Sequence, residues 1–449
     1  MTSFLFYLII FVVVSVIFTY FLKKYYHAKT YLIFSIVKSK KLAEKFAKLN
    51  FSSLWDVLGD FGVYLGFGSL GVFYIRKEKN KLISCLYVLL LFAAFFGLLY
   101  FLAGKTFLYS FFGSLIFAAF GFSGIVVYLL IAQTIMLFQL FLEGQSKCVG
   151  IAPVLPGVKI PKVPLTIPFF EGWIALIIGM LIHEFSHAVL MKKAKVKIGA
   201  FGPLLLGFLP IGAFVEPDEK KLKSIELKKK LRIYAAGPAM NIVFAILIFI
   251  AYIIFGITTA GYASDISQQH GAVYITAVDE YGGLCGEGGL SGNYGLVDIN
   301  TKILAVNDVN VYSTMSFKTQ NDLALKNGDR NIALNLEKDS NIYDTTLSFN
   351  DKNYLGISLE QQYDKETPFR FSVISFIASL LYWLFLLNLL IGIFNFLPVI
   401  PFDGGAMAMT LYSPLAFFVK KEKREKVVMT FFIVLIVILL ILNLLPIFG

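Results

Sequence analysis

Long apolar stretches separated by short polar segments run through most of this chain. A helix needs about 20 apolar residues to cross a bilayer. The stretches that meet this requirement are 4–22, 82–103, 169–191, 231–254, 371–397 and 427–448. The stretch 106–142 fits one long tilted helix or two short crossings, and 61–75 fits a short span or an interfacial segment. The pattern predicts a polytopic α-helical membrane protein in which 4–22 is an uncleaved helix.

Two segments interrupt this pattern. Residues 143–168 contain five prolines and are predicted to form an extended loop. Residues 198–214 are apolar but are broken by glycine and proline, which are poor helix formers. A re-entrant loop or a hairpin is therefore expected there.

Residues 262–366 are more polar and are predicted to form one small β-rich soluble domain. Apolar residues alternate with polar ones around the Asn307-Asp308 pair, which predicts a hairpin. Further strands are expected at 331–336 and 345–349. A helix over 316–326 is expected between the hairpin and these strands.

The distribution of charge orients the predicted spans. Residues 192–232 hold eleven Lys or Arg against four acids, and 420–426 hold five against two, whereas 257–368 hold seven against fifteen. The positive-inside rule places both basic loops in the cytosol, the soluble domain outside, and residues 183–187 nearer the cytosolic face.

Composition excludes two classes of protein. With 57% hydrophobic and only 15% charged residues, the chain is too apolar for an ordinary soluble protein. No basic patch is interleaved with exposed aromatic residues, which excludes nucleic acid as a partner. The three cysteines show no zinc or redox spacing.

The most informative motif is His183-Glu184-Phe185-Ser186-His187, at the end of the apolar stretch 169–191. Residues four apart lie on one face of a helix, so both imidazoles can reach one cation. Glu184 is poorly placed to be a third ligand but well placed to act as a general base on water. Two His ligands and a Glu base form the zinc-peptidase pattern. Ionisable groups at membrane depth are costly without a metal or partners, which favours a Zn²⁺ site.

A third ligand is needed at similar depth, and Asp403 is the best candidate. It follows a span that runs inward from the outside and ends at Pro398 and Pro401, where irregular backbone is tolerated if it lines a cavity. Gly404-Gly405 lets the chain turn beside a metal. The alternative is that Asp403 only caps a helix or stabilises a turn. No other Asp or Glu within the predicted spans lies at this depth, which favours the ligand role for Asp403.

Three motifs, between about 169 and 449, resemble the signatures of the site-2 protease family of intramembrane zinc metalloproteases. They are His183–His187, Gly237-Pro238-Ala239-Met240-Asn241, and Asn395-Phe396-Leu397-Pro398 followed by Phe402-Asp403-Gly404. The family usually has leucine where Phe402 stands. Residues 1–168 show no such match, and an N-terminal region of this kind resembles archaeal members.

The resemblance implies roles for several residues. Asp403 would be the third zinc ligand, and Asn241 and Asn395 would line the active-site cleft. An edge strand of a membrane-embedded hairpin would pair with an unwound substrate. The residues of that strand are Gly212, Ala213, Phe214, Val215 and Glu216.

The resemblance also divides the chain into four parts. Residues 1–168 form an N-terminal membrane region with about two to four spans, 169–256 and 371–449 form the two halves of the catalytic core, and 262–366 form the soluble domain. That domain resembles a PDZ domain, which binds extended peptides by strand addition. Its glycine-rich run 282–290 departs from the usual binding loop, so gripping a peptide ligand and screening substrates sterically both stay open.

The expected function is that of an intramembrane zinc metalloprotease that cuts transmembrane segments of membrane-anchored proteins in regulated intramembrane proteolysis. Its expected partners are such a substrate, the lipid bilayer and a peptide ligand of the PDZ-like domain. Two alternatives are a metal-ion transporter and a catalytically idle scaffold that presents a PDZ domain. A transporter has no evident use for Glu184, and no inverted repeat is visible. A scaffold does not explain why every catalytic residue type is present.

Overall fold

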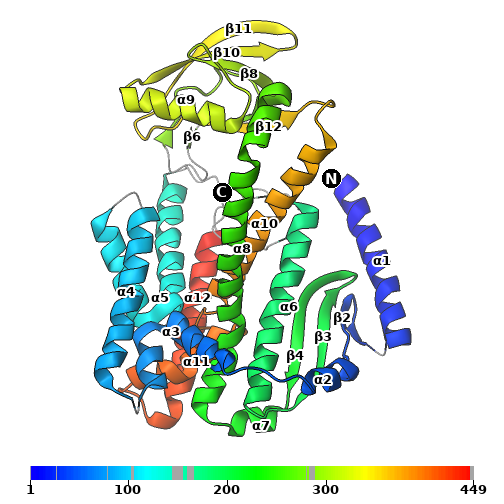
Figure 1. Ribbon diagram of the computed structural model, residues 1–449, viewed down its shortest axis with the longest axis vertical. Coiled ribbons are helices and arrows are strands. Elements are labelled where there is room, and N and C mark those ends of the chain that lie inside the picture. Colours follow the sequence, from blue (N-terminus) through cyan, green and yellow to red (C-terminus); the bar gives the residue numbers. More distant parts are fainter. Residues whose placement is uncertain are drawn as a thin grey trace. The chain divides into compact units, whose positions relative to one another are not determined.

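The computed structural model describes residues 2–26, 28–77, 79–102, 106–143, 155–158, 166–279, 281–282 and 289–444. The chain is a polytopic α-helical protein with small antiparallel β-sheets, as its hydrophobic pattern predicts (Figure 1). Within the described residues, seven helices are long and apolar enough to cross a membrane. The chain forms two compact units. The first comprises Met1–Leu130, Gly172–Ile248 and Trp383–Val437, and the second comprises Ile131–Glu171, Phe249–Tyr382 and Ile438–Gly449.

The predicted spans coincide with α-helices to within a few residues, except that one helix is much longer than expected. The helices are α1 (Thr2–Tyr26), α2 (Lys40–Ala47), α3 (Leu54–Ile75), α4 (Lys81–Leu102), α5 (Phe107–Leu142), α6 (Phe169–Lys193), α7 (Glu219–Ser224), α8 (Leu227–His270), α9 (Thr314–Asn327), α10 (Phe369–Phe394), α11 (Asp403–Leu411) and α12 (Arg424–Leu444). The 44 residues of α8 extend past the predicted end at 254 and lead directly into the β domain.

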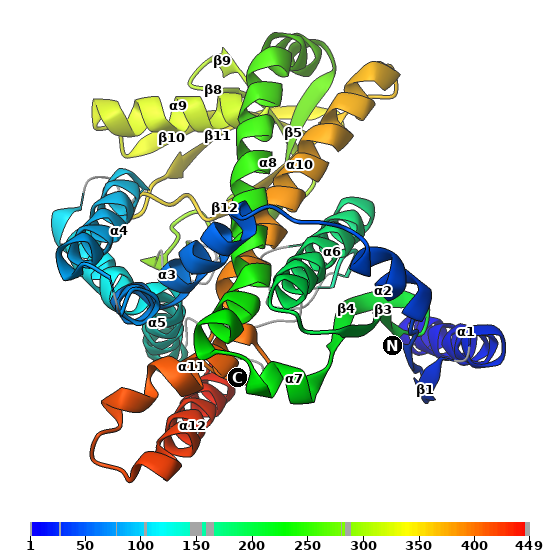
Figure 2. The same cartoon turned by 60° about the horizontal axis from the view of Figure 1, so that its bottom comes forward.

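A four-stranded sheet in the first unit confirms the hairpin expected at 198–214. The strands are β1 (Lys29–Tyr31), β2 (Phe34–Ile36), β3 (Ile198–Leu206) and β4 (Leu209–Pro217), and they pair in that order. The N-terminal hairpin β1–β2, which the sequence did not predict, covers the outer edge of β3. Among the described strands, β4 is thus left as an open edge, beside α6 (Figures 1 and 2).

Two glycines break helices of the N-terminal region and make them fold back. Gly68 in α3 has a φ of 53° and Gly121 in α5 has a φ of 63°, values that glycine adopts without steric cost. A Cβ atom on Gly71 would lie 3.1 Å from Cγ1 of Val63, whereas residues eight apart in a straight helix are about 12 Å apart. The two breaks also touch, because a Cβ atom on Gly68 would lie 2.8 Å from the Gly121 nitrogen. The stretch 106–142 is therefore two helical segments, and 61–75 belongs to a helix that doubles back.

The core of the first unit joins the N-terminal region to the catalytic core. Fully or almost fully buried side chains from α3, α8 and α11 pack together with Phe396, which follows α10. Among them are Val63, Phe67, Ile242 and Met407. The described residues up to Leu130 therefore belong to the same compact unit as most of the zinc-motif helix and are not a separate appendage.

The second unit holds the β domain. Its strands are β5 (Gly271–Val278), β6 (Tyr281–Gly282), β7 (Gly289–Leu290), β8 (Thr301–Val306), β9 (Val309–Asn310), β10 (Asn331–Lys338), β11 (Asn341–Ser348) and β12 (Ile357–Tyr363). The main sheet has the order β11-β10-β8-β5-β12, with β9 paired to β8.

The predicted elements of this domain are confirmed. The hairpin around Asn307-Asp308 is β8–β9, the strands expected at 331–336 and 345–349 lie in β10 and β11, and the expected helix lies in α9. Alternate residues of β10 are buried, and Phe317 and Ala324 of α9 join the same core. Most of the glycine-rich run 282–290 and much of the proline-rich loop 143–168 lie outside the described residues.

Candidate metal centre

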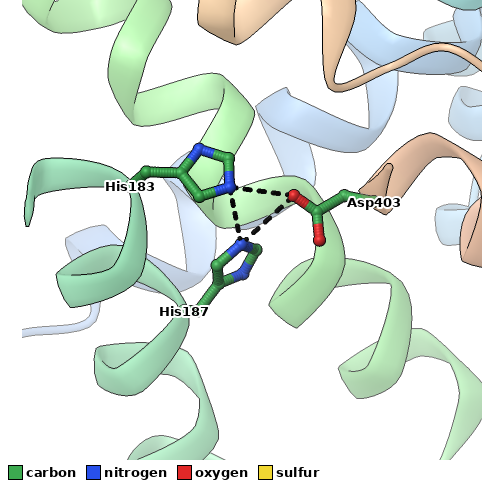
Figure 3. A group of neighbouring side chains, drawn as sticks. All are labelled: His183, His187 and Asp403. Carbon is green, nitrogen blue, oxygen red and sulfur yellow. Dashed lines mark hydrogen bonds and ion pairs between the residues drawn. The ribbon is translucent and has the colours of Figure 1, made fainter. Parts of the chain in front are cut away.

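The helix α6 places two imidazoles side by side. His183 and His187 are four residues apart and therefore lie on one helix face. Both side chains are buried, and their ring centroids are 4.7 Å apart. Their Nε2 atoms are 3.1 Å apart and point to the same space (Figure 3). The structure therefore brings this pair together as the spacing predicted.

Asp403 reaches the same point from the other half of the catalytic core. It is the first residue of α11, and its Oδ2 lies 3.0 Å from His183 Nε2 and 3.2 Å from His187 Nε2 (Figure 3). The Gly404 N–H donates to the Asn395 carbonyl oxygen over 2.7 Å, which fixes the start of α11 against the end of α10. Among the described His, Cys, Asp and Glu residues, these three form the group whose ligand atoms lie close enough together to hold one metal ion.

The donor set fits zinc. Tetrahedral zinc with ligand bonds of about 2.0–2.1 Å separates its ligand atoms by about 3.3 Å, close to the distances of 3.0–3.2 Å found here. The Nδ1 atom of His187 lies 2.6 Å from the Ile233 carbonyl oxygen, which accepts its proton. That tautomer leaves Nε2 with a free lone pair, as a metal ligand requires.

Gly237 forms a cradle for these donor atoms. A Cβ atom at this position would lie 2.5 Å from His187 Nε2 and 2.7 Å from His183 Nε2. Any side chain on Gly237 would therefore occupy the space where the donors converge. This explains why the Gly-Pro-Ala-Met-Asn motif of α8 needs glycine at its first position.

Glu184 lies between the donor cluster and a large apolar cavity. The cavity has a volume of about 830 Å³. It is lined by Glu184, by three of the predicted hairpin residues, Gly212, Ala213 and Phe214, and by Met240 of α8. Glu184 thus lies near the cluster and lines a space that could admit a peptide.

The open edge of β4 presents its backbone toward Glu184. Phe201 of β3 faces Val215 of β4, but its N–H and C=O both bond to Ser39, on the far side. The N–H and C=O of Val215 therefore point to the open edge, because hydrogen-bonded and non-bonded pairs alternate in an antiparallel ladder. The Val215 backbone lies close to the Glu184 carboxylate. Ala213, two residues earlier, shares this orientation.

The remaining predicted residues lie in different surroundings. Glu216 accepts a 2.5 Å hydrogen bond from Lys38. Asn241 is fully buried, one turn of α8 beyond Gly237, and neither atom of its amide has a hydrogen-bond partner. The Asn395 side chain donates to the Ile391 carbonyl oxygen, one turn earlier in α10.

Several residues near the site were missed by the sequence reasoning. Part of the cavity wall comes from Phe46 and Leu49, in and after α2, and from Trp55. Phe46 and Trp55 each contact the ring of Phe185, with centroids 5.6 and 6.1 Å apart. The amphipathic pattern of residues 40–47 was the available signal, but it does not specify which surface the helix covers.

The folded-back helices α3 and α5 support the segment that carries Asp403. Phe396 is fully buried, touches Gly66 of α3 and stacks on Phe122 of α5. Further along, the Tyr412 hydroxyl bonds to Ser123 Oγ over 3.0 Å. A Phe-Gly-x-x-Gly pattern occurs at both breaks, at 67–71 and 120–124, and was the signal for this crossing.

Comparison with known proteins agrees with this arrangement. A family model described as peptidase family M50 matches residues 171–440. The chain is also similar to the uncharacterized protein MJ0971 of Methanocaldococcus jannaschii, at 26% identity over 240 residues, which are 53% of this chain and 56% of that protein. The chain therefore aligns with little more than half of the length of this relative.

The match to the family model covers more than half of the chain and includes the His183–His187 motif, the Asn241 motif and Asp403. Together with the membrane-length helices, it makes the protein an integral multi-pass membrane protein. The chain belongs to peptidase family M50, the site-2 protease family.

Proposed function

We propose that the protein is an intramembrane zinc endopeptidase that cuts transmembrane segments of membrane-anchored proteins. The observation that carries this proposal is the convergence of three donor atoms beside Glu184, on an apolar cavity bordered by an open strand edge. A transporter site would need the donors but not a strand edge with its backbone groups unpaired.

Zinc held by His183, His187 and Asp403 would supply Lewis acidity, which activates water and polarises a carbonyl group. Glu184 is the general base in this proposal. Its carboxylate takes a proton from the attacking water and later delivers it to the nitrogen of the departing amine. That carboxylate lies close to the Val215 backbone, at the strand edge along which the scissile bond would lie.

The substrate would bind as an extended strand along β4. A helical segment holds its carbonyl groups in internal hydrogen bonds. Unwinding it in the membrane exposes polar groups, and each group left unpaired costs roughly several kcal/mol of free energy. The open-edge groups of Ala213 and Val215 would pair with such groups and offset that cost. The apolar cavity beside Gly212 and Phe214 would receive substrate side chains.

The basic loops around α7 and before α12 would face the cytosol, and the β domain would lie outside. Helix α9 and the sheet of that domain suit a PDZ-like module, which would select substrates by gripping a peptide or by steric screening. None of the described residues of the β domain belongs to the metal cluster. Its role in this proposal is therefore selection and not chemistry.

The test separates metal binding from proton transfer. Glu184→Gln should keep one zinc per chain in elemental analysis but lower cleavage of a model transmembrane peptide by about 10²–10⁴-fold or more. The double variant His183→Ala, His187→Ala should lose the zinc as well. Two results would contradict the assigned roles. One is full zinc content in the double variant, and the other is cleavage by Glu184→Gln at a rate within about tenfold of that of the unaltered enzyme.

A further inference from the structure

A second large cavity lies in the first unit, among α3, α4, α5 and α8. Its volume is about 730 Å³, within the range of about 300–1,000 Å³ that is usual for pockets that enclose small ligands. No residue of the metal cluster or of the β3–β4 hairpin lines it. Most of its wall is apolar, with Leu90, Ala94 and Leu98 on α4, Phe117 on α5 and Ile246 on α8.

One end of this cavity is cationic. Arg76 and Lys79 line it together with a single acid, Asp60. Asp60 is already neutralised, because Arg232 donates to both of its carboxylate oxygens over 2.6 and 2.7 Å. Within the part of the chain that the structure describes, no carboxylate lies in ion-pair distance of Arg76 or Lys79. The end of the cavity therefore carries an uncompensated positive charge.

Arg76 is held in position by uncharged groups. Its Nε donates to Ser84 Oγ over 3.2 Å, and its guanidinium carbon lies 4.8 Å from the centre of the Tyr87 ring. Tyr64, which also lines the cavity, lies beside it. These contacts fix the side chain and leave guanidinium N–H groups for an anion.

The folded-back shape of α3 explains why this charge sits at one end of an apolar space. The turn at Gly68 returns the chain, so that Arg76 lies beside Tyr64 and on the same side as the start of α3. That start is tied to the basic end of α6 by the ion pair of Asp56 with Lys193, 3.1 Å apart. In the proposed topology this is the cytosolic side, where anionic headgroups attract basic pockets between membrane helices.

We propose that this cavity binds one membrane lipid with an anionic phosphate headgroup. The phosphate lies against Arg76 and Lys79, and a hydrocarbon chain lies along α4 between Phe117 and Ile246. A zwitterionic lipid would bring its own cation to the same place and would bind more weakly. The binding needs no cleavage and no zinc, so its test is independent of the proposed protease activity.

The experiment uses the full chain, purified in detergent, reconstituted in nanodiscs that contain phosphatidylcholine with a minor share of phosphatidylglycerol, and then re-extracted. Native mass spectrometry should show one retained phosphatidylglycerol per chain. Arg76→Gln with Lys79→Gln should reduce the retained fraction at least tenfold, and Ala94→Trp, which fills the apolar part, should reduce it as well. Lys79→Gln alone should act in the same direction without disturbing the packed contacts of Arg76.

The matched control is Lys77→Gln with Lys81→Gln, which removes the same charge from the same loop but from residues that do not line the cavity. This control should retain the lipid as the unaltered chain does. An equal loss in the control would show general attraction to a basic loop and would overturn the proposal. Equal retention of phosphatidylcholine, or displacement of the lipid by inorganic phosphate alone, would overturn it too.

Discussion

Two fully buried asparagines in different parts of the molecule differ in the hydrogen bonding of their side-chain amides. Asn293 in the β domain donates to the carbonyl oxygens of Ser348 and Leu355, each over 2.8 Å, and accepts from the Ser348 N–H. Asn241, in α8 of the first unit, has no hydrogen-bond partner for either amide atom. Buried polar groups are normally paired, so an unpaired one needs an explanation.

The contrast reflects the surroundings of each of these two amides. In the β domain a buried amide closes a loop against the sheet, and its bonds contribute to stability. Around the metal centre, Asn241 and Nδ1 of His183 keep unused hydrogen-bonding capacity. Such groups cost free energy in the resting protein, and a substrate that supplies their partners would recover it.

Two glycines of the same two regions also differ, in the space around their Cβ positions. A Cβ atom on Gly237 in the first unit would lie within 2.7 Å of the Nε2 atoms of both His183 and His187, whereas Gly292 in the β domain has open space at its Cβ position. The first kind of glycine permits a close approach that the site requires. The second kind is open to substitution.

The largest effect is expected at Gly237. Gly237→Ala should lower zinc affinity at least a hundredfold and abolish cleavage, because the new methyl group would lie 2.5 Å from His187 Nε2. Gly256→Ala, on the same helix but with open space around it, should leave both unchanged. Competition with a chelating dye would measure the affinity. Normal zinc affinity in Gly237→Ala would mean that the donors converge elsewhere.

The asparagine pair is expected to give the next largest effect. Asn293→Leu should destabilise the β domain by about 2–4 kcal/mol, because three hydrogen bonds between the Asn293 amide and the backbone are lost. Asn241→Leu should leave the unfolding free energy within about 1 kcal/mol of its original value and yet lower cleavage about tenfold or more.

Thermal unfolding and cleavage of a model transmembrane peptide, measured on both variants, would check this. If Asn241→Leu destabilised the protein as much as Asn293→Leu, the amide would be a structural group and the comparison would fail.

A smaller effect is expected from the support behind Asp403. Gly66→Ala should lower zinc affinity about tenfold, because its methyl group would push on Phe396 and shift the segment leading to α11. Adding Phe396→Leu should restore much of the affinity by removing the clash. Gly97→Ala, on α4 with open space, is the control.

The absorption spectrum of the cobalt-substituted protein would report the ligand geometry in each variant. A spectrum unchanged by Gly66→Ala, with unchanged affinity, would show that α3 does not position Asp403.

Much of the site could be predicted because its parts carry strong local signals. The spacing of His183 and His187 sets a shared helix face, and the glycines and prolines of 198–214 exclude a helix and favour a hairpin. Asp403 could be chosen because few acids lie in the apolar segments. The length of α8 could not be predicted, because polar residues near 262–270 resemble a domain linker as much as a helix end.

The support around the site could not be predicted in the same way. Nothing in residues 29–36 indicates that they pair with β3, since short strands carry little pattern of their own. The repeated Phe-Gly-x-x-Gly pattern at 67–71 and 120–124 marks two breaks but does not say that they touch. Phe46 and Trp55 form a cavity wall only because α2 is placed over α6, where Lys192 contacts the carbonyl oxygens at its end.

The sequence by itself determined the membrane-spanning segments, the zinc motif and the β-rich insertion, because these depend on periodicity and spacing within one segment. The tertiary structure decided how Asp403 meets His183 across 220 residues, which edge of the hairpin stays open, and where α3 and α5 fold back to support the site. These features arise from packing between distant segments, whose free energy depends on shapes that no single segment encodes.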